Sequence, residues 1–168
     1  MAARLGSARR AAHGAARLTV ADVGKRYREG QPLCMVTAYD LFSGAVGRAA
    51  GADMLLVGDS LANVMLGFED TAQATLQDMT RAVGAVKRGM QRQGGDGPMP
   101  LIVGDIPFVS SVGATLQDAA QLVVHGADCV KLEGASPVQL AKVRELVNNG
   151  ISVMAHIGLV RQQRKKKK

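Results

Sequence analysis

The sequence predicts an α/β fold built on parallel β-strands, and two patterns support this prediction. Short apolar runs alternate with helix-length amphipathic segments along residues 19–160, as expected for β/α repeats. The apolar runs contain few polar residues, which is typical of parallel strands covered on both faces. Two architectures fit this pattern: a five-stranded doubly wound sheet, and a (β/α)8 TIM barrel of which only about the first five β/α units are present.

Five apolar runs are predicted to be strands because each is short, rich in Val, Leu, Ile or Met, and bounded by polar residues or glycine. A stretch rich in glycine and proline at residues 93–100 is predicted to be a surface loop before the third strand. The predicted strands are residues 33–37, 54–57, 101–104, 128–132 and 151–155.

Each predicted helix begins at a capping residue, and most end near a glycine. Three begin with a Thr-x-x-Asp capping box, one with an aspartate, and the last with a serine followed by proline at the first helical position. The predicted caps are Thr19, Asp40, Thr75, Thr115 and Ser136. The predicted ends lie near Gly30, Gly51, Met90, Gly126 and Gly150.

Composition argues against two classes of function. The net charge is +7, but four arginines precede residue 19 and six basic residues follow residue 160, which leaves 11 basic and 14 acidic residues in the body. A body with that balance and only 3% aromatic residues lacks the basic surface and stacking side chains of a nucleic-acid-binding protein. No apolar run approaches the roughly 18 residues that a transmembrane helix needs, so no membrane span is predicted.

The two ends differ from the body. Residues 1–18 contain four arginines, many alanines and no acidic residue, which predicts a mitochondrial transit peptide; the alternative is a disordered leader on a cytoplasmic protein. Residues 161–168 contain only Arg, Gln and Lys, which predicts a disordered basic tail. Residues 19–160 are therefore expected to form one incomplete barrel domain. Its cysteines, Cys34 and Cys129, lie in apolar runs and are expected to be buried free thiols.

A chemically capable residue lies at the carboxyl end of every predicted strand. In parallel α/β folds these ends share one edge, where ligands bind and catalytic groups lie. Each such residue has an ordinary explanation by itself, as a helix cap, a turn former or an ion-pair partner. Their repetition at one edge predicts a binding site. The residues are Tyr39, Asp40, Asp59, Ser60, Asp105, Lys131, Glu133 and His156.

Three of these residues, Asp59, Asp105 and Glu133, would bring carboxylates together from adjacent strands. Clustered anions raise one another's pKa unless a cation is present. Oxygen ligands without thiols favour Mg²⁺. Lys131 adds a positive charge suited to an anionic substrate, and His156 can donate or accept a hydrogen bond near neutral pH.

Five motifs occur at these strand ends: VTAYD at 36–40, LLVGDSL at 55–61, GDIPF at 104–108, VKLEG at 130–134 and HIGL at 156–159. In order and approximate spacing they resemble the ketopantoate hydroxymethyltransferase (3-methyl-2-oxobutanoate hydroxymethyltransferase) family, over about residues 20–159. The resemblance implies a (β/α)8 barrel enzyme. It would transfer a hydroxymethyl group from 5,10-methylenetetrahydrofolate to 3-methyl-2-oxobutanoate and give 2-dehydropantoate, in pantothenate and coenzyme A biosynthesis.

The resemblance also implies roles for particular residues. It implies that Mg²⁺ is held by Asp59, Asp105 and Glu133, the last of them through water. It implies substrate contacts from Asp59, Ser60, Asp105, Lys131 and His156. His156 is expected to support catalysis, whereas the family's general base is a glutamate in a later strand, so no residue up to Lys168 is assigned that role. Small-molecule substrates and a homo-oligomer are the implied partners.

Two segments depart from the family's usual pattern. After HIGL the chain continues with Val-Arg-Gln at 160–162 where the family has Thr-Pro-Gln, so the last three β/α units are expected to be absent. Residues 67–74 differ from the run that usually follows GDSL. Two functional hypotheses therefore stay open: a hydroxymethyltransferase, and a non-catalytic fragment that binds Mg²⁺ and the keto acid.

Overall fold

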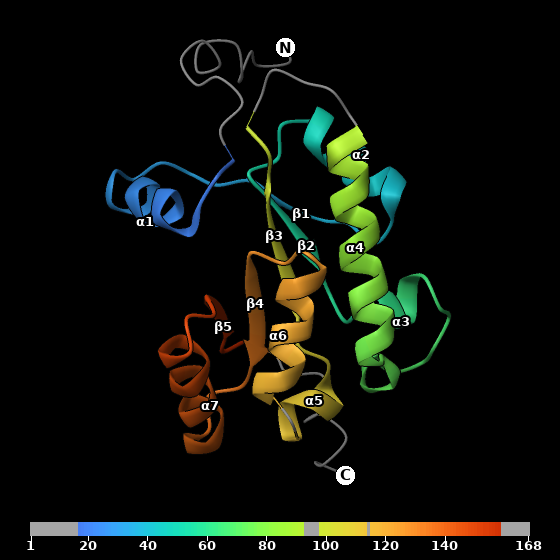
Figure 1. The fold of residues 1–168 in the computed structure, drawn as a ribbon, viewed down its shortest axis with the longest axis vertical. Coiled ribbons are helices and arrows are strands. Elements are labelled where there is room, and N and C mark those ends of the chain that lie inside the picture. The colour runs from blue at the N-terminus through green and yellow to red at the C-terminus, as the bar shows by residue number, and fades with distance from the viewer. Residues whose placement is uncertain (1–16, 93–97, 114, 159–168) are drawn as a thin grey trace.

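The strands form one parallel sheet in a computed structural model that describes residues 17–92, 98–113 and 115–158 (Figure 1). Their order is β1-β2-β3-β4-β5, and each pairs in parallel with the next. A doubly wound sheet would reverse its strand order at a switch point. The consecutive order therefore selects the barrel, with five of its strands in the described chain. The strands are β1 (Met35–Thr37), β2 (Met54–Val57), β3 (Leu101–Asp105), β4 (Cys129–Glu133) and β5 (Val153–His156).

All five predicted strands and all five predicted long helices are present; the second strand has the predicted bounds, and the bounds of the other four differ by one or two residues. Two short α-helices and one 3₁₀ helix, which were not predicted, follow the strands at the carboxyl edge: α3 (Leu61–Val64), η1 (Thr71–Gln73) and α5 (Phe108–Val112). The remaining helices are α1 (Val20–Arg28), α2 (Leu41–Ala49), α4 (Leu76–Arg92), α6 (Thr115–His125) and α7 (Pro137–Asn148).

Most predicted helix caps are confirmed. Thr19 and Asp40 each form a capping box with the residue three positions later. Thr75 exchanges hydrogen bonds with Asp78, and the Ser136 hydroxyl accepts from the Gln139 N–H. The predicted cap at Thr115 is wrong: Thr115 is the first residue of α6, and its hydroxyl donates to the carbonyl oxygen of Ser110, 2.9 Å away. The reason is that α5 ends just before α6 and offers its carbonyl groups to that hydroxyl.

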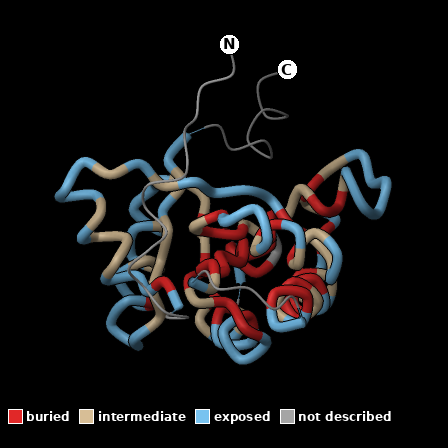
Figure 2. Tube along the Cα trace, turned by 90° about the horizontal axis from the view of Figure 1, so that it is seen from above, coloured by how far each residue is buried: buried red, intermediate tan, exposed pale blue. Residues whose placement is uncertain are grey.

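The sheet has a different apolar layer on each face. Alternate strand residues such as Leu55, Ile102 and Val130 pack with α4 and α6 in the larger core cluster. The intervening residues, among them Val103 and Cys129, form a smaller cluster on the opposite face. Figure 2 shows the buried positions gathered at the centre of the molecule. Because side chains alternate along a strand, the second set faces the inside of the barrel.

Helix α1 covers the amino-terminal ends of the strands. The Leu18 N–H donates to the Met99 carbonyl oxygen just before β3, at 3.1 Å. Arg26 pairs with Asp53 before β2 at 2.5 Å, and Arg17 pairs with Asp128 before β4 at 2.6 Å. In Figure 1, α1 lies apart from α4 and α6, on the other side of the strands. The amino-terminal edge is therefore occupied by a helix, and the carboxyl edge is left for the site.

Helices α2 and α4 approach so closely that only glycine fits at their contact. A Cβ atom at Gly89 would overlap the carbonyl oxygen of Leu41, and one at Gly44 would overlap the carbonyl oxygen of Val86. This close packing holds the helices that follow β1 and β2 against the sheet.

Several sequence predictions are corrected or lie outside the described residues. Cys129 is buried as predicted, but Cys34 is exposed, because it lies just before β1 at the edge of the sheet rather than inside it. The predicted transit peptide (all but its last two residues), the basic tail and residues 93–97 of the predicted loop fall outside the described chain. Among the described helices, none is long and apolar enough to cross a membrane.

Candidate metal and active site

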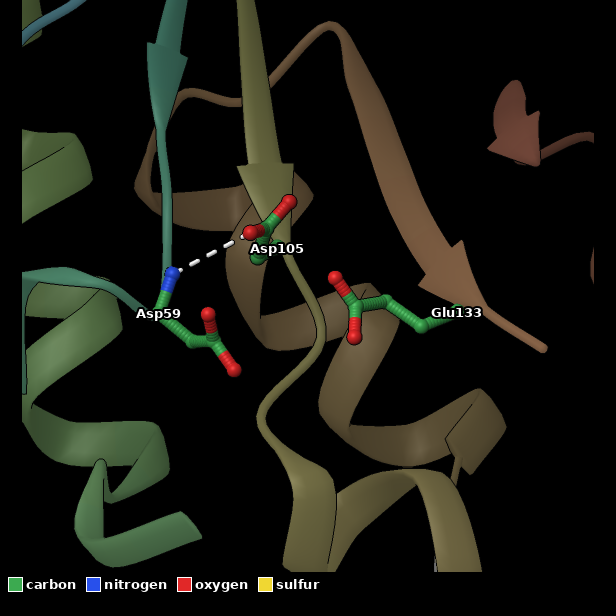
Figure 3. Close-up of side chains that lie close together, drawn as sticks. All are labelled: Asp59, Asp105 and Glu133. Carbon is green, nitrogen blue, oxygen red and sulfur yellow. Dashed lines mark hydrogen bonds between the residues drawn. The ribbon is translucent and has the colours of Figure 1, made fainter. Parts of the chain in front are cut away.

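The three predicted carboxylates lie together at the carboxyl edge of the sheet. Asp59 follows β2, whereas Asp105 and Glu133 end β3 and β4. One oxygen of each lies within 4.8 Å of the others, and Figure 3 shows the side chains converging from the three neighbouring strands. Parallel pairing in register produces this arrangement, because it brings the ends of consecutive strands to the same level.

Asp59 is held through its main chain. Its backbone N–H donates to Oδ2 of Asp105 at 3.1 Å. Gly58 permits the close approach: a Cβ there would lie 2.9 Å from Oγ of Ser60 and 3.4 Å from Oδ2 of Asp105. Burial, and then the negative charges of Asp105 and Glu133, raise the pKa of Asp59 to about 6.

Asp105 and Lys131 form the central ion pair of the site. They are register partners on β3 and β4, and Nζ of Lys131 lies 2.8 Å from both oxygens of the Asp105 carboxylate. Burial raises the pKa of Asp105, although Lys131 acts in the opposite direction. Burial acts to lower the pKa of Lys131, but the charges of Asp105 and Glu133 outweigh it, so the pKa is raised and Lys131 is an ammonium ion at neutral pH.

Lys131 also reaches Oε1 of Glu133 at 3.4 Å. One ammonium group therefore serves two carboxylates, and Asp59 adds a third negative charge beside them. When all three are ionised, the negative charge of the cluster exceeds what Lys131 neutralises.

The donor set fits a hard divalent cation. All three donors are carboxylate oxygens, no thiol takes part, and Asp105 is buried while Asp59 and Glu133 are partly accessible. Mg²⁺ prefers such oxygen ligands and retains some of its waters. A divalent charge would also offset the repulsion that raises the pKa of Asp59.

Ser60 and His156 also lie at this edge. The Ser60 hydroxyl shares a hydrogen bond of 2.9 Å with the Tyr39 hydroxyl, which fixes its position beside Asp59. His156 ends β5 and is the register partner of Glu133. The structure thus brings all the predicted site residues to one edge: Asp59, Ser60, Asp105, Lys131, Glu133 and His156.

Tyr39 helps to hold the site, but the sequence placed it only among the residues at the strand ends and gave it no individual role. It belongs to the VTAYD motif after the first strand, so its place in a motif was a usable signal. Only the folded chain shows that its hydroxyl reaches the hydroxyl of Ser60, 21 positions later.

The fold and the position of the cluster define a class of protein, the (β/α)-barrel enzymes, whose active sites lie at the carboxyl ends of the strands. Within that class, residues 17–167 match the ketopantoate hydroxymethyltransferase family, and this chain belongs to it.

Two curated relatives are 3-methyl-2-oxobutanoate hydroxymethyltransferases. The protein from Ignicoccus hospitalis is 43% identical over 151 residues, which cover 88% of this chain and 54% of that protein. The Deinococcus radiodurans protein is 45% identical over 138 residues, which cover 79% of this chain and 46% of that protein. The chain thus spans about half the length of the curated relatives that it matches.

Solved structures confirm the fold. A 2,3-dimethylmalate lyase of the PEP mutase/isocitrate lyase superfamily matches 82% of this chain and 52% of its own, with a TM-score of 0.55 and 17% identity. An oxaloacetate acetylhydrolase also matches over 82% of this chain and 52% of the acetylhydrolase chain, with a TM-score of 0.58 and 17% identity. At such identities the likeness establishes the fold alone.

Proposed function

We propose that this chain carries the metal- and keto-acid-binding edge of a 3-methyl-2-oxobutanoate hydroxymethyltransferase. The reaction transfers a hydroxymethyl group from 5,10-methylenetetrahydrofolate to 3-methyl-2-oxobutanoate and gives 2-dehydropantoate for pantothenate synthesis. The observation that carries this proposal is the oxygen-only cluster of Asp59, Asp105 and Glu133, in a chain that belongs to the family.

The same three residues would hold Mg²⁺, which supplies a Lewis acid for the carboxylate and ketone oxygens of a 2-oxo acid. The Ser60 hydroxyl, held by Tyr39, can donate a hydrogen bond to a substrate oxygen. Lys131 keeps a fixed positive charge beside the cluster, where an anionic substrate would be attracted.

A hydrogen bond to the substrate and removal of a substrate proton also belong to this chemistry. His156 lies next to Glu133 across the β4–β5 pair, where its ring can donate a hydrogen bond to the substrate or accept one from it. Removal of the C3 proton of the keto acid requires a base, and we assign that role to none of the described residues.

Binding and turnover are measured separately to test the proposal. Calorimetric titration of the full chain with 3-methyl-2-oxobutanoate is expected to show binding in Mg²⁺ and none in EDTA, and Asp59→Ala is expected to lose it. Glu145→Gln is the matched control, because it removes an exposed carboxylate on α7. Formation of 2-dehydropantoate with the folate donor supports the transferase. Binding without product supports the non-catalytic alternative, and absence of keto-acid binding overturns both.

A homo-oligomer and a mitochondrial location are further proposals. The first is supported by the family and tested by light scattering of the purified chain. The second is supported by the arginines and the lack of acidic residues in residues 1–18. A fluorescent fusion of that segment that stays in the cytoplasm would contradict it.

A further inference from the structure

The hydroxyl of Ser60 does not cap the helix that it precedes. Ser60 is the N-cap residue of α3, a position at which a serine hydroxyl usually accepts a hydrogen bond from a backbone N–H of the first turn. The Ser60 side chain forms no such bond, and its backbone is already helical, with φ −55° and ψ −13°. The ordinary role of a helix cap therefore does not account for this hydroxyl.

The hydroxyl of Ser60 is instead hydrogen-bonded to that of Tyr39, at 2.9 Å. The Tyr39 ring packs against the larger core cluster. Just before it, the Ala38 N–H donates to the Leu56 carbonyl oxygen at 2.9 Å. The Tyr39 N–H donates to Oγ of Ser43, in the first turn of α2, also at 2.9 Å. The core and α2 thus fix the position of Tyr39 independently of Ser60.

The Ser60 hydroxyl lies beside the carboxylate cluster. Ser60 follows Asp59 directly in the chain. A Cβ atom at Gly58 would lie 2.9 Å from Oγ of Ser60 and 3.4 Å from Oδ2 of Asp105. The serine hydroxyl and the Asp105 carboxylate therefore flank the same point, and the hydroxyl borders the edge at which the proposed function places the oxygens of a keto acid.

An anionic substrate would set the direction of the hydrogen bond between the two hydroxyls. Each hydroxyl has a single hydrogen, and either oxygen can be the donor in the chain alone. The carboxylate oxygens of a 2-oxo acid can only accept, so Ser60 would direct its hydrogen towards them and Tyr39 would donate to Oγ of Ser60. Two hydrogen bonds in such a row polarise and strengthen each other.

We propose that Tyr39 is a positioning residue for Ser60: its hydroxyl donates to Oγ of Ser60 and turns the serine hydrogen towards an anionic oxygen of the keto acid. This inference rests on the proposed function, because it requires a keto acid bound beside Ser60. Tyr39 itself contacts neither the cation nor the substrate in this arrangement. Its effect is therefore confined to keto-acid affinity, and it disappears when the Ser60 hydroxyl is removed.

Four variants of the full chain test this role. Tyr39→Phe removes the hydroxyl and keeps the ring against the core, Ser60→Ala removes the group through which Tyr39 acts, and the double variant combines the two. Tyr27→Phe is the matched control, because Tyr27 is the other tyrosine of the chain and is 82% exposed on α1. Calorimetry measures the dissociation constants of 3-methyl-2-oxobutanoate in saturating Mg²⁺ and of Mg²⁺ without keto acid. Urea unfolding measures stability.

Tyr39→Phe is expected to raise the keto-acid dissociation constant by about 3–10-fold, the effect of one lost hydrogen bond, and to leave the Mg²⁺ dissociation constant unchanged. Ser60→Ala is expected to raise the keto-acid constant by about 10–100-fold, because the lost bond ends on a charged oxygen. The double variant should match Ser60→Ala within about twofold, because Tyr39 then has nothing to position. Tyr27→Phe should bind as the original chain does.

The outcomes separate the positioning role from the proposed function. A merely structural Tyr39 would weaken keto-acid binding by the same factor with or without the Ser60 hydroxyl, and that result overturns the positioning role alone. Keto-acid binding that is unchanged in Tyr39→Phe, or a Tyr39→Phe chain that does not fold, overturns it as well. An original chain that does not bind the keto acid in Mg²⁺ overturns the proposed function, and the positioning role with it.

Discussion

The Lys131 ammonium group lies 2.8 Å from both carboxylate oxygens of Asp105, at the point where β3 and β4 end. Only 12% of the Lys131 side chain and 5% of the Asp105 side chain are exposed. Breaking such a buried pair leaves a charge without compensation in a poorly solvated place. Lys131 thus has a structural task in addition to its proposed attraction of substrate.

Replacement of Lys131 by methionine removes the positive charge that serves Asp105 and Glu133. In EDTA we expect Lys131→Met to lower the free energy of unfolding by about 3–5 kcal/mol, the usual cost of breaking a buried pair. Added Mg²⁺ should recover part of the loss, because the cation supplies charge at the same place. Urea unfolding measures both effects. Lys25→Met, at an exposed position of α1, should stay within about 0.5 kcal/mol; equal stability of the two variants would contradict the structural task.

Asp59 makes the stability of the metal-free chain depend on pH. Its pKa rises from 3.8 to about 6 on folding, so the folded chain retains a proton that the unfolded chain has released. The favourable contribution of protonated Asp59 is complete below pH 3.8 and is lost as the pH rises through about 6.

Asp59→Asn removes this ionisation and keeps nearly the same side-chain shape. The variant is expected to become increasingly more stable than the original chain between about pH 4 and about pH 7 in EDTA, with no further change above that range. Urea midpoints across the range measure the difference. A difference that does not depend on pH would show that Asp59 titrates alike in both states.

Two glycine-to-alanine substitutions should have opposite effects. Gly89→Ala places a methyl group on the Leu41 carbonyl oxygen between α2 and α4, and overpacking of this kind costs about 1–3 kcal/mol. Gly24→Ala in α1 meets only the end of the Arg28 side chain at 3.5 Å, so its better helix propensity should stabilise the chain by up to about 1 kcal/mol. Thermal unfolding compares them, and a Gly89→Ala variant as stable as the original chain, or more stable, would refute the close helix contact.

The two cysteines should differ in reactivity. Cys34 is exposed, whereas Cys129 is buried and burial raises its pKa to about 11. Because the thiolate is the reactive form, a disulfide reagent at neutral pH should modify Cys34 rapidly and Cys129 only after unfolding. Cys34→Ser should abolish the rapid phase. Rapid modification of Cys129 in the folded chain would place it outside the core.

Local sequence signals predicted the strands and the long helices well. Apolar runs and caps such as Thr19, Asp40 and Ser136 act within a few residues, so they can be recognised without the fold. The short elements α3, η1 and α5 have no such periodicity, and they were missed. Thr115 was misassigned as a cap because the acceptor of its hydroxyl, Ser110, belongs to a helix that the sequence did not reveal.

The sequence alone determined that Asp59, Asp105, Lys131, Glu133 and His156 would lie at one edge, because the carboxyl ends of parallel strands must coincide there. Tertiary structure decided the strand order, and with it the choice of the barrel over the doubly wound sheet. It also decided that Lys131 bridges two carboxylates and that Tyr39 holds Ser60. The contacts of Lys131 with Asp105 and of Tyr39 with Ser60 depend on distances of a few ångströms between residues remote in sequence, which only the packing of the chain fixes.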